Sequence, residues 1–232
     1  MTPYPVEAQE DASRTPFRDR HDAGRLLARK LRRYAGRSDT LVLALPRGGV
    51  PVAFEVALAL DLPLDVCVVR RLAAPGRDSI TLGAVAAGGS WILDEAAIQK
   101  NRVDDRTLRE VAERAFRELR SLEESYRGGQ PALDIRGRTV ILVDEGATTG
   151  LTLFQAATAL RRHAPVGIVA AVPTASAAAR ARVDGGADEW VGLFEPDPFS
   201  SVGLAYLDFT QPSLELVRNL LRFAARAPRR RR

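Results

Sequence analysis

Residues 139–152, TVILVDEGATTGLT, constrain the fold more than any other stretch of the chain. The first five, TVILV, form a short run without charge, which is typical of a strand that is buried on both faces of a parallel sheet. Two acids, Asp144 and Glu145, follow directly, and a turn rich in glycine and threonine leads into a helical pattern. We therefore expect a charged pair at the carboxyl edge of a sheet, beside a turn whose N–H groups can bind an anion.

Strand and helix patterns alternate along the rest of the chain, which predicts an α/β fold with a single domain and a doubly wound, mostly parallel sheet. We expect strands at 40–45, 64–69, 139–143, 166–172 and 187–194. We expect helices at 18–34, 50–60, 151–162, 176–183 and 213–226, and a long one that begins at Asp94 or Asp104 and continues to Tyr126. Residues 72–90 are rich in glycine and alanine and predict a mobile loop, with a short hairpin between 82–85 and 91–93.

Composition and charge limit the other possibilities. We expect a flexible segment at 1–16, the domain at 17–225 and a basic tail at 226–232. The net charge of +5 equals the five arginines after Ala225, so a weak contact through this tail is the only nucleic-acid role expected. No apolar run approaches the roughly 20 residues that span a bilayer, so no membrane role is expected. The only cysteine, Cys67, lies in an apolar run, which fits a core position in a reducing cytoplasm.

The chemistry of the acid pair and the turn suggests a phosphorylated sugar. Two carboxylates at one strand end can accept hydrogen bonds from adjacent ribose hydroxyls. The N–H groups and hydroxyls of residues 146–152 can donate to a phosphate, and the helix dipole adds about 0.3–1 kcal/mol. An ordinary helix N-terminus with capping threonines is the simpler alternative, and the residues alone leave it open. The G-x-G-x-x-G dinucleotide pattern follows none of the expected strands.

Three segments together resemble a known family. VILVDEGATTG resembles the motif with which type I phosphoribosyltransferases bind 5-phosphoribosyl-1-pyrophosphate (PRPP). LALPRGGVPVAFEVALALDLPLDVCVVRRL and EPDPFSSVGLAYLDFTQ are similar to the start and the C-terminal segment of a bacterial branch of that family. The resemblance covers most of residues 17–220. It implies the type I phosphoribosyltransferase fold with a small hood, in which residues 72–90 match the mobile hood over PRPP.

The resemblance also implies roles for individual residues. The expected catalytic residues are Asp144, Glu145 and Arg71, of which the two acids would hold the ribose hydroxyls. The 5′-phosphate would be bound by Gly146, Ala147, Thr148, Thr149, Gly150, Leu151 and Thr152. The pyrophosphate would be bound by Arg47, Gly48, Gly49, Arg70 and Arg71, in a loop where the family often has a non-proline cis peptide. The acceptor would meet Phe199, Tyr206 and Asp208. Mg²⁺ would arrive with PRPP, with Asp144, Glu145 and Asp208 as the protein ligands.

The implied function is transfer of the 5-phosphoribosyl group of PRPP to a base-like acceptor, with release of pyrophosphate, in the nucleotide metabolism of the cytoplasm. A homodimer is implied as well. Three positions depart from the family pattern: Glu145 replaces the usual Asp, Thr148 replaces an Asp of some purine enzymes, and Arg71 replaces the Lys common in this branch. A regulator of the same fold, which binds PRPP or a nucleotide without turnover, therefore remains the alternative. Hydrolysis of ribosyl phosphates also stays open, and the residues do not specify the acceptor.

Overall fold

The computed structural model describes residues 17–86 and 89–226. The segment 1–16, expected to be flexible, lies outside the described residues. Of the basic tail at 226–232, only Arg226 is described, and it closes the last helix. The two predictions about the chain ends therefore stay predictions.

A five-stranded parallel sheet forms the centre of the protein. It contains β1 (Thr40–Ala44), β2 (Leu64–Val66), β6 (Thr139–Val143), β7 (Gly167–Thr174) and β8 (Glu189–Phe194), in the spatial order β2-β1-β6-β7-β8. The predicted doubly wound α/β fold is confirmed. The chain runs outward from β1 in one direction and from β6 in the other. Ligands bind such sheets at this reversal, in the crevice beyond the carboxyl ends of the strands.

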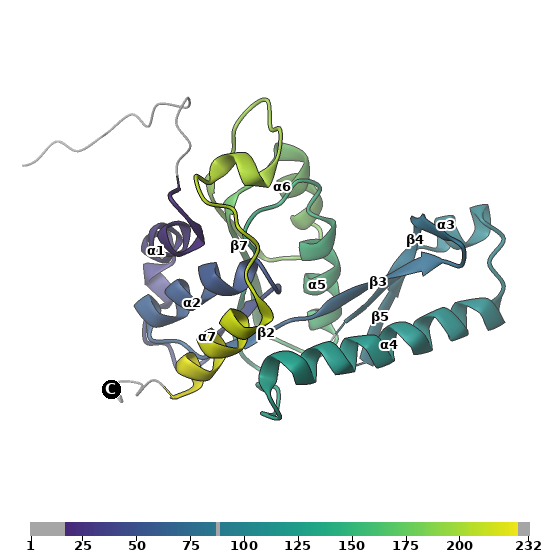
Figure 1. Ribbon diagram of the computed structural model, residues 1–232, viewed down its shortest axis with the longest axis horizontal. Coiled ribbons are helices and arrows are strands. Elements are labelled where there is room, and N and C mark those ends of the chain that lie inside the picture. The colour runs from purple at the N-terminus through teal and green to yellow at the C-terminus, as the bar shows by residue number, and fades with distance from the viewer. Residues whose placement is uncertain (1–16, 87–88, 227–232) are drawn as a thin grey trace, which may run out of the picture.

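Helices cover both faces of this sheet (Figure 1). One face carries α1 (Arg20–Lys30), α2 (Gly49–Leu60) and α7 (Leu214–Arg226), and the other carries α5 (Leu151–Arg161) and α6 (Ala177–Val183). Alternate strand residues enter the two cores: Val42 and Ile141 pack on the α2 side, and Leu41 and Leu142 pack on the α5 side. All four side chains are fully buried. This two-sided burial explains why the strands are apolar without interruption.

The segment after β2 forms an arm of paired strands, so the prediction of a loop at 72–90 is wrong for the described residues, and residues 87 and 88 lie outside them. An antiparallel sheet of β3 (Val69–Ala74), β4 (Arg77–Ala86) and β5 (Ser90–Leu93) extends from the body beside a long helix, α4 (Asp105–Arg127) (Figure 1). The hairpin between 82–85 and 91–93 is confirmed, with Val85 opposite Trp91. The apolar side chains of Leu72 and Leu82 are fully buried in the core shared with α4. Burial of one sheet face against a helix outweighs the low strand propensity of the glycines and alanines.

Two helices, not one, occupy residues 94–127. Asp94 accepts a hydrogen bond from the N–H of Ala97 at 2.9 Å and begins α3 (Glu95–Lys100). Asp104 accepts one from the N–H of Thr107 at 2.8 Å and begins α4 (Asp105–Arg127). Both predicted capping positions are therefore used, one for each helix.

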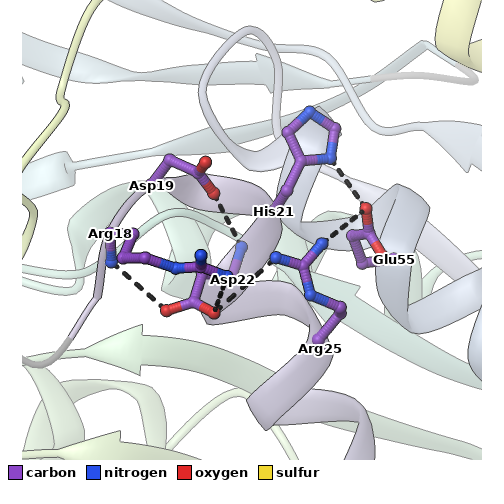
Figure 2. Close-up of polar contacts among 6 residues, drawn as sticks. All are labelled: Arg18, Asp19, His21, Asp22, Arg25 and Glu55. Carbon is purple, nitrogen blue, oxygen red and sulfur yellow. Dashed lines mark hydrogen bonds and ion pairs between the residues drawn. The ribbon is translucent and has the colours of Figure 1, made fainter.

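The first helix is fixed against α2 by polar contacts (Figure 2). Glu55 on α2 accepts from Arg25 at 3.3 Å and contacts His21 Nδ1 at 2.9 Å, while Asp22 pairs with Arg25 within α1. Gly24 allows the close approach, because a Cβ there would lie 2.5 Å from the carbonyl oxygen of Val52. These contacts join α1 to α2, and those of Arg25 are partly exposed to solvent.

The start of the described chain meets residues 205–207 beside the first turn of α1. Phe17 forms a bridge with Tyr206, in which its N–H donates to Ala205 O at 3.2 Å and its carbonyl accepts from Leu207 N at 2.9 Å. A short 3₁₀ turn at Val202–Ala205 precedes this bridge, and another at Arg32–Tyr34 follows α1. The C-terminal segment is therefore held close to the start of α1. Among the described residues, no helix is long and apolar enough to cross a membrane.

Candidate active site

The PRGG loop and the acid pair leave neighbouring strands side by side. β1 and β6 are paired in parallel with Ala44 opposite Val143, so residues 45–49 and 144–150 begin at the same edge of the sheet. The N–H of Leu45 continues this pairing with a 2.8 Å bond to Val143 O. The Pro46–Arg47 peptide is cis, as the resemblance implied. The reversal of strand order thus falls between the two predicted binding loops.

Two glycines of the PRGG loop are required by the acids that cross it. A Cβ on Gly48 would lie 2.0 Å from Glu145 Oε2 and 2.2 Å from Oε1. A Cβ on Gly49 would lie 2.9 Å from Val143 O and 3.3 Å from Asp144 Oδ1. A Cβ at position 49 would press on backbone atoms of residues 143 and 144, which cannot move aside, whereas a Cβ at position 48 would displace the flexible end of Glu145.

The two acids have different surroundings. Burial raises the pKa of Asp144 to about 8, and the neighbouring Glu145 adds to the rise. Asp144 Oδ1 accepts a 2.8 Å hydrogen bond from the N–H of Glu145. The Glu145 carboxylate instead forms an ion pair with Arg20 Nε from the first turn of α1. A buried carboxyl group whose pKa is strongly shifted by its surroundings is typical of a functional site.

The turn after the acids is pinned through its carbonyl groups. The carbonyl oxygens of Thr148 and Thr149 accept from Ser176 Oγ and Arg182 Nη1, each at 2.6 Å. Gly150 adopts a left-handed conformation at φ 68°, where a Cβ would lie 2.5 Å from Ala179 O. The loop is therefore held on the side of α6, with glycine required where it enters α5.

The N–H groups of this turn are available to a ligand. Within the part of the chain that is described, the N–H groups of Thr148, Thr149 and Gly150 have no intramolecular acceptor. They border a cavity of about 220 Å³ lined by Asp144, residues 146–153 and Val202. The hydroxyl-bearing side chains of Thr148, Thr149 and Thr152 are exposed. Free N–H donors at the start of a helix form an anion site.

Three basic side chains come from the PRGG loop and from β3. Arg47 is exposed, and Arg70 pairs with Glu118 of α4. Burial raises the pKa of Tyr126, and the positive charges of Arg47 and Arg70 both oppose that rise, which places the two arginines near one phenol. Arg71 contacts Thr81 Oγ1 at 3.4 Å at the base of the arm.

The C-terminal segment forms the remaining wall. Tyr206 is 5% exposed, and its ring packs on Phe17 and on Phe209 with centroid distances of 5.4 and 5.2 Å. Its hydroxyl donates to the carbonyl oxygen of Glu145 at 2.5 Å. Asp208 is exposed, and a 2.9 Å bond from the N–H of Thr210 lowers its pKa. In this conformation the Tyr206 ring supports the wall and does not face the solvent.

Comparison with known proteins identifies the family. A model of the "Phosphoribosyl transferase domain" matches residues 18–198. The chain belongs to the phosphoribosyl transferase family. Two Mycobacterium tuberculosis proteins, from strains CDC 1551 / Oshkosh and ATCC 25618 / H37Rv, carry the provisional name phosphoribosyl transferase and are 40% identical over 197 residues, 85% of this chain. The match covers 44% of each relative, so the chain spans less than half of their length.

A solved structure supports the same fold. The crystal structure of a protein from Thermus thermophilus is 42% identical, with a TM-score of 0.77 over 88% of this chain and 97% of that one. The family resemblance inferred from the sequence is thus confirmed.

Arg20 was not among the site residues that the sequence motifs predicted. Its side chain is 5% exposed, and among the described residues it makes the ion pair that joins α1 to the acid pair. A signal was present in the sequence: Arg20 lies at helical spacing from Ala23, Leu27 and Leu31, which are all buried. A charged residue in the apolar stripe of a helix indicates a buried partner elsewhere in the fold.

The acid pair is compatible with Mg²⁺ bound mainly by a substrate. Among the described residues, no three His, Cys, Asp or Glu side chains lie close enough together to hold a metal ion. Carboxylate oxygens are nevertheless the ligand type that Mg²⁺ prefers, and it commonly uses one or two of them together with phosphate oxygens and water. Asp144 and Glu145 would supply these one or two ligands.

Proposed function

We propose that this phosphoribosyl transferase family member transfers the 5-phosphoribosyl group of PRPP to a base-like acceptor and releases pyrophosphate. The observation that carries the proposal is the pairing of two elements at one sheet edge. An acid pair suited to ribose hydroxyls adjoins a cavity of about 220 Å³ that is bordered by free N–H groups suited to a phosphate. A merely structural helix start would need neither the acids nor the cavity.

The loop at 146–152 would bind the 5′-phosphate. Its free N–H groups and the threonine hydroxyls donate to the phosphate oxygens, and the dipole of α5 favours the negative charge. With this end anchored, Asp144 and Glu145 accept hydrogen bonds from the ribose hydroxyls. The anomeric carbon is thereby oriented toward the PRGG loop.

The reaction replaces one bond at the anomeric carbon by another. The bond from this carbon to pyrophosphate breaks, its electron pair leaves with the pyrophosphate, the lone pair of the acceptor forms the new bond, and the proton carried by that acceptor atom is lost to solvent. Arg47, Arg70 and Arg71 would bind the departing pyrophosphate and stabilise its growing charge. Mg²⁺ carried by PRPP would supply further neutralisation. Arg71, with the two acids, therefore remains the proposed catalytic set.

The acceptor would lie against the C-terminal segment. Phe199 is partly exposed and offers a ring face, and Asp208 offers an exposed carboxylate to a polar base edge or to a metal ion. Tyr206 would act through its hydroxyl bond to Glu145, since its ring is enclosed. The cis Asp197–Pro198 peptide lies directly before Phe199 in this wall.

A binding protein without turnover is the second candidate. One observation favours it: the Glu145 carboxylate already has a partner, Arg20, and ribose must share it. Such a regulator would form a PRPP complex but release no pyrophosphate with any base.

One experiment separates the two candidates. Titration calorimetry with PRPP and Mg²⁺ measures binding, and pyrophosphate release with a panel of purine and pyrimidine bases measures turnover. We expect Asp144→Asn to weaken PRPP binding at least tenfold, and Asp184→Asn, at the exposed end of α6, to leave it unchanged. Binding without pyrophosphate release would select the regulator, and no binding at all would refute both.

The cytoplasmic location and the homodimer belong to the same proposal. The buried Cys67 is compatible with a reducing compartment. Fractionation of cells and light scattering of the purified protein test these two points.

A further inference from the structure

Arg20 connects parts of the site that lie far apart in the sequence. Its Nε donates to Glu145 Oε2, 125 residues away, and its Nη1 donates to Thr210 O, 190 residues away, at 2.9 Å. Its guanidinium also lies over the ring of Phe209 at 4.1 Å. One planar side chain therefore touches the acid that would hold the ribose and the wall that would hold the acceptor.

The charge of Arg20 reaches the other acids of the site as well. It lowers the pKa of Asp144 against the effect of burial, and it lowers that of Asp208. Its Nη2 is buried and has no hydrogen-bond partner among the described residues. Burial of a cation with an unsatisfied N–H is unfavourable, so such a group in a native fold calls for a reason other than packing.

The length of Glu145 makes this contact necessary. The carboxylate lies across Gly48, within 2.0–2.2 Å of where a Cβ would stand. A glutamate has one more rotatable bond than the usual aspartate, so without a partner its carboxylate would take several positions. Arg20 holds it in one of them. A charge-assisted bond from a rigid guanidinium gives both energy and direction.

We propose that Arg20 is a positioning residue: it sets the Glu145 carboxylate for the ribose hydroxyls and couples it to residues 206–210, so that PRPP and the acceptor bind cooperatively. This inference rests on the proposed function. Ribose binding at Glu145 shifts the guanidinium or fixes it, and either change is transmitted to the wall through Thr210 and Phe209. Coupling is reciprocal, so the acceptor raises PRPP affinity by the same factor as PRPP raises acceptor affinity.

Three variants test the proposal. Arg20→Gln removes the charge, and Arg20→Lys keeps the charge but loses the planar fork. Arg25→Gln removes an arginine of the same helix whose printed partners are Asp22 and Glu55 (Figure 2). For each, thermal melting checks folding, calorimetry with PRPP and Mg²⁺ gives the affinity, and hydrogen exchange of residues 206–210 is measured with and without PRPP.

We expect Arg20→Gln to weaken PRPP binding about tenfold or more, the loss of one charge-assisted hydrogen bond. Arg25→Gln should stay within twofold of the wild type. PRPP should protect residues 206–210 from exchange in the wild type, and this protection should disappear in Arg20→Lys even where much of the affinity remains. A structural role alone would lower the melting temperature without removing the response to PRPP.

The contrary results are distinct. Wild-type PRPP affinity in Arg20→Gln, or an unchanged exchange response in Arg20→Lys, overturns the inference while the proposed function stands. If Arg20→Gln does not fold, Arg20→Lys alone decides. If the wild type binds no PRPP, the proposed function fails, and crystal structures of the wild type and Arg20→Lys then decide. If the Glu145 carboxylate no longer lies across Gly48 in Arg20→Lys, or if Thr210 has moved, the positioning role of Arg20 is supported. If both residues keep their wild-type positions, that role is refuted.

Discussion

Replacement of Gly150 by alanine should damage both stability and phosphate binding. Gly150 has φ 68°, and a Cβ there would lie 2.5 Å from the carbonyl oxygen of Ala179 and 3.0 Å from its Cα. These are backbone atoms of α6, which cannot move aside as the tip of a flexible side chain can. The turn that supplies the phosphate N–H groups must therefore shift.

The expected loss of unfolding free energy has two parts, which a control variant separates. A left-handed alanine costs about 1–2 kcal/mol, from which the reduced freedom of the unfolded chain returns about 0.4–1 kcal/mol. The clash adds about 1–3 kcal/mol, as overpacking does in cores. Gly137 also has φ 68°, but nothing lies within 4 Å of its added Cβ. Gly137→Ala should thus cost about 1 kcal/mol, and Gly150→Ala about 2–4 kcal/mol.

Urea unfolding of the two variants and the wild type measures these differences. Calorimetry with ribose 5-phosphate then tests the site: Gly150→Ala should bind it at least tenfold more weakly, and Gly137→Ala should bind it as the wild type does. Equal losses of stability in the two variants would show that the contact with α6 is unimportant. Unchanged ribose 5-phosphate affinity in Gly150→Ala would refute the assignment of the turn as a phosphate site.

Three further predictions follow from burial and contact. Arg127→Met should lower the free energy of unfolding in urea by about 3–5 kcal/mol, since it leaves the Asp65 side chain, 9% exposed, without its ion-pair partner at 2.9 Å. Loss of the exposed Arg106 should lower it by less than about 1 kcal/mol, and equal losses would contradict this prediction. Burial raises the pKa of the Cys67 thiol to about 12, so it should resist a thiol reagent at pH 8 until the protein unfolds, and fast labelling would disprove its burial. Because the unfolded thiol ionises near its ordinary value of 9.0, the stability contributed by Cys67 should fall as pH rises above 9. Gly48→Ala should displace the acid that lies across it and weaken PRPP binding at least tenfold by calorimetry, with wild-type affinity as the contrary result.

Much of the fold could be predicted because its signals are local. The apolar runs of β1 and β6 predicted buried strands, and the glycines of the PRGG loop marked the point where the chain must leave the sheet. The arm was missed for a physical reason. The glycines and alanines of β3 and β4 have low strand propensity, and only the pairing of these two strands and the burial of Leu72 and Leu82 against α4 make them a sheet.

The candidate site also has parts that the sequence predicted and parts that it did not. The acid pair and the threonine turn are adjacent in the sequence, so their chemistry follows from the order of the residues alone. Tyr206 was expected to face an acceptor together with Phe199 and Asp208, yet its ring is enclosed by Phe17 and Phe209. Its position depends on pairing with Phe17, which no local pattern specifies.

By itself, the sequence determined which residues end the strands and what chemistry those residues offer, because side-chain alternation and turn propensity act over a few neighbours. Only the tertiary structure decided that Arg20 lies against Glu145 and Thr210, since contacts across 125 and 190 residues arise from the packing of α1 on α2 and from the pairing of Phe17 with Tyr206. The burial that makes these contacts strong is a property of the folded molecule, and no segment of the chain has it alone.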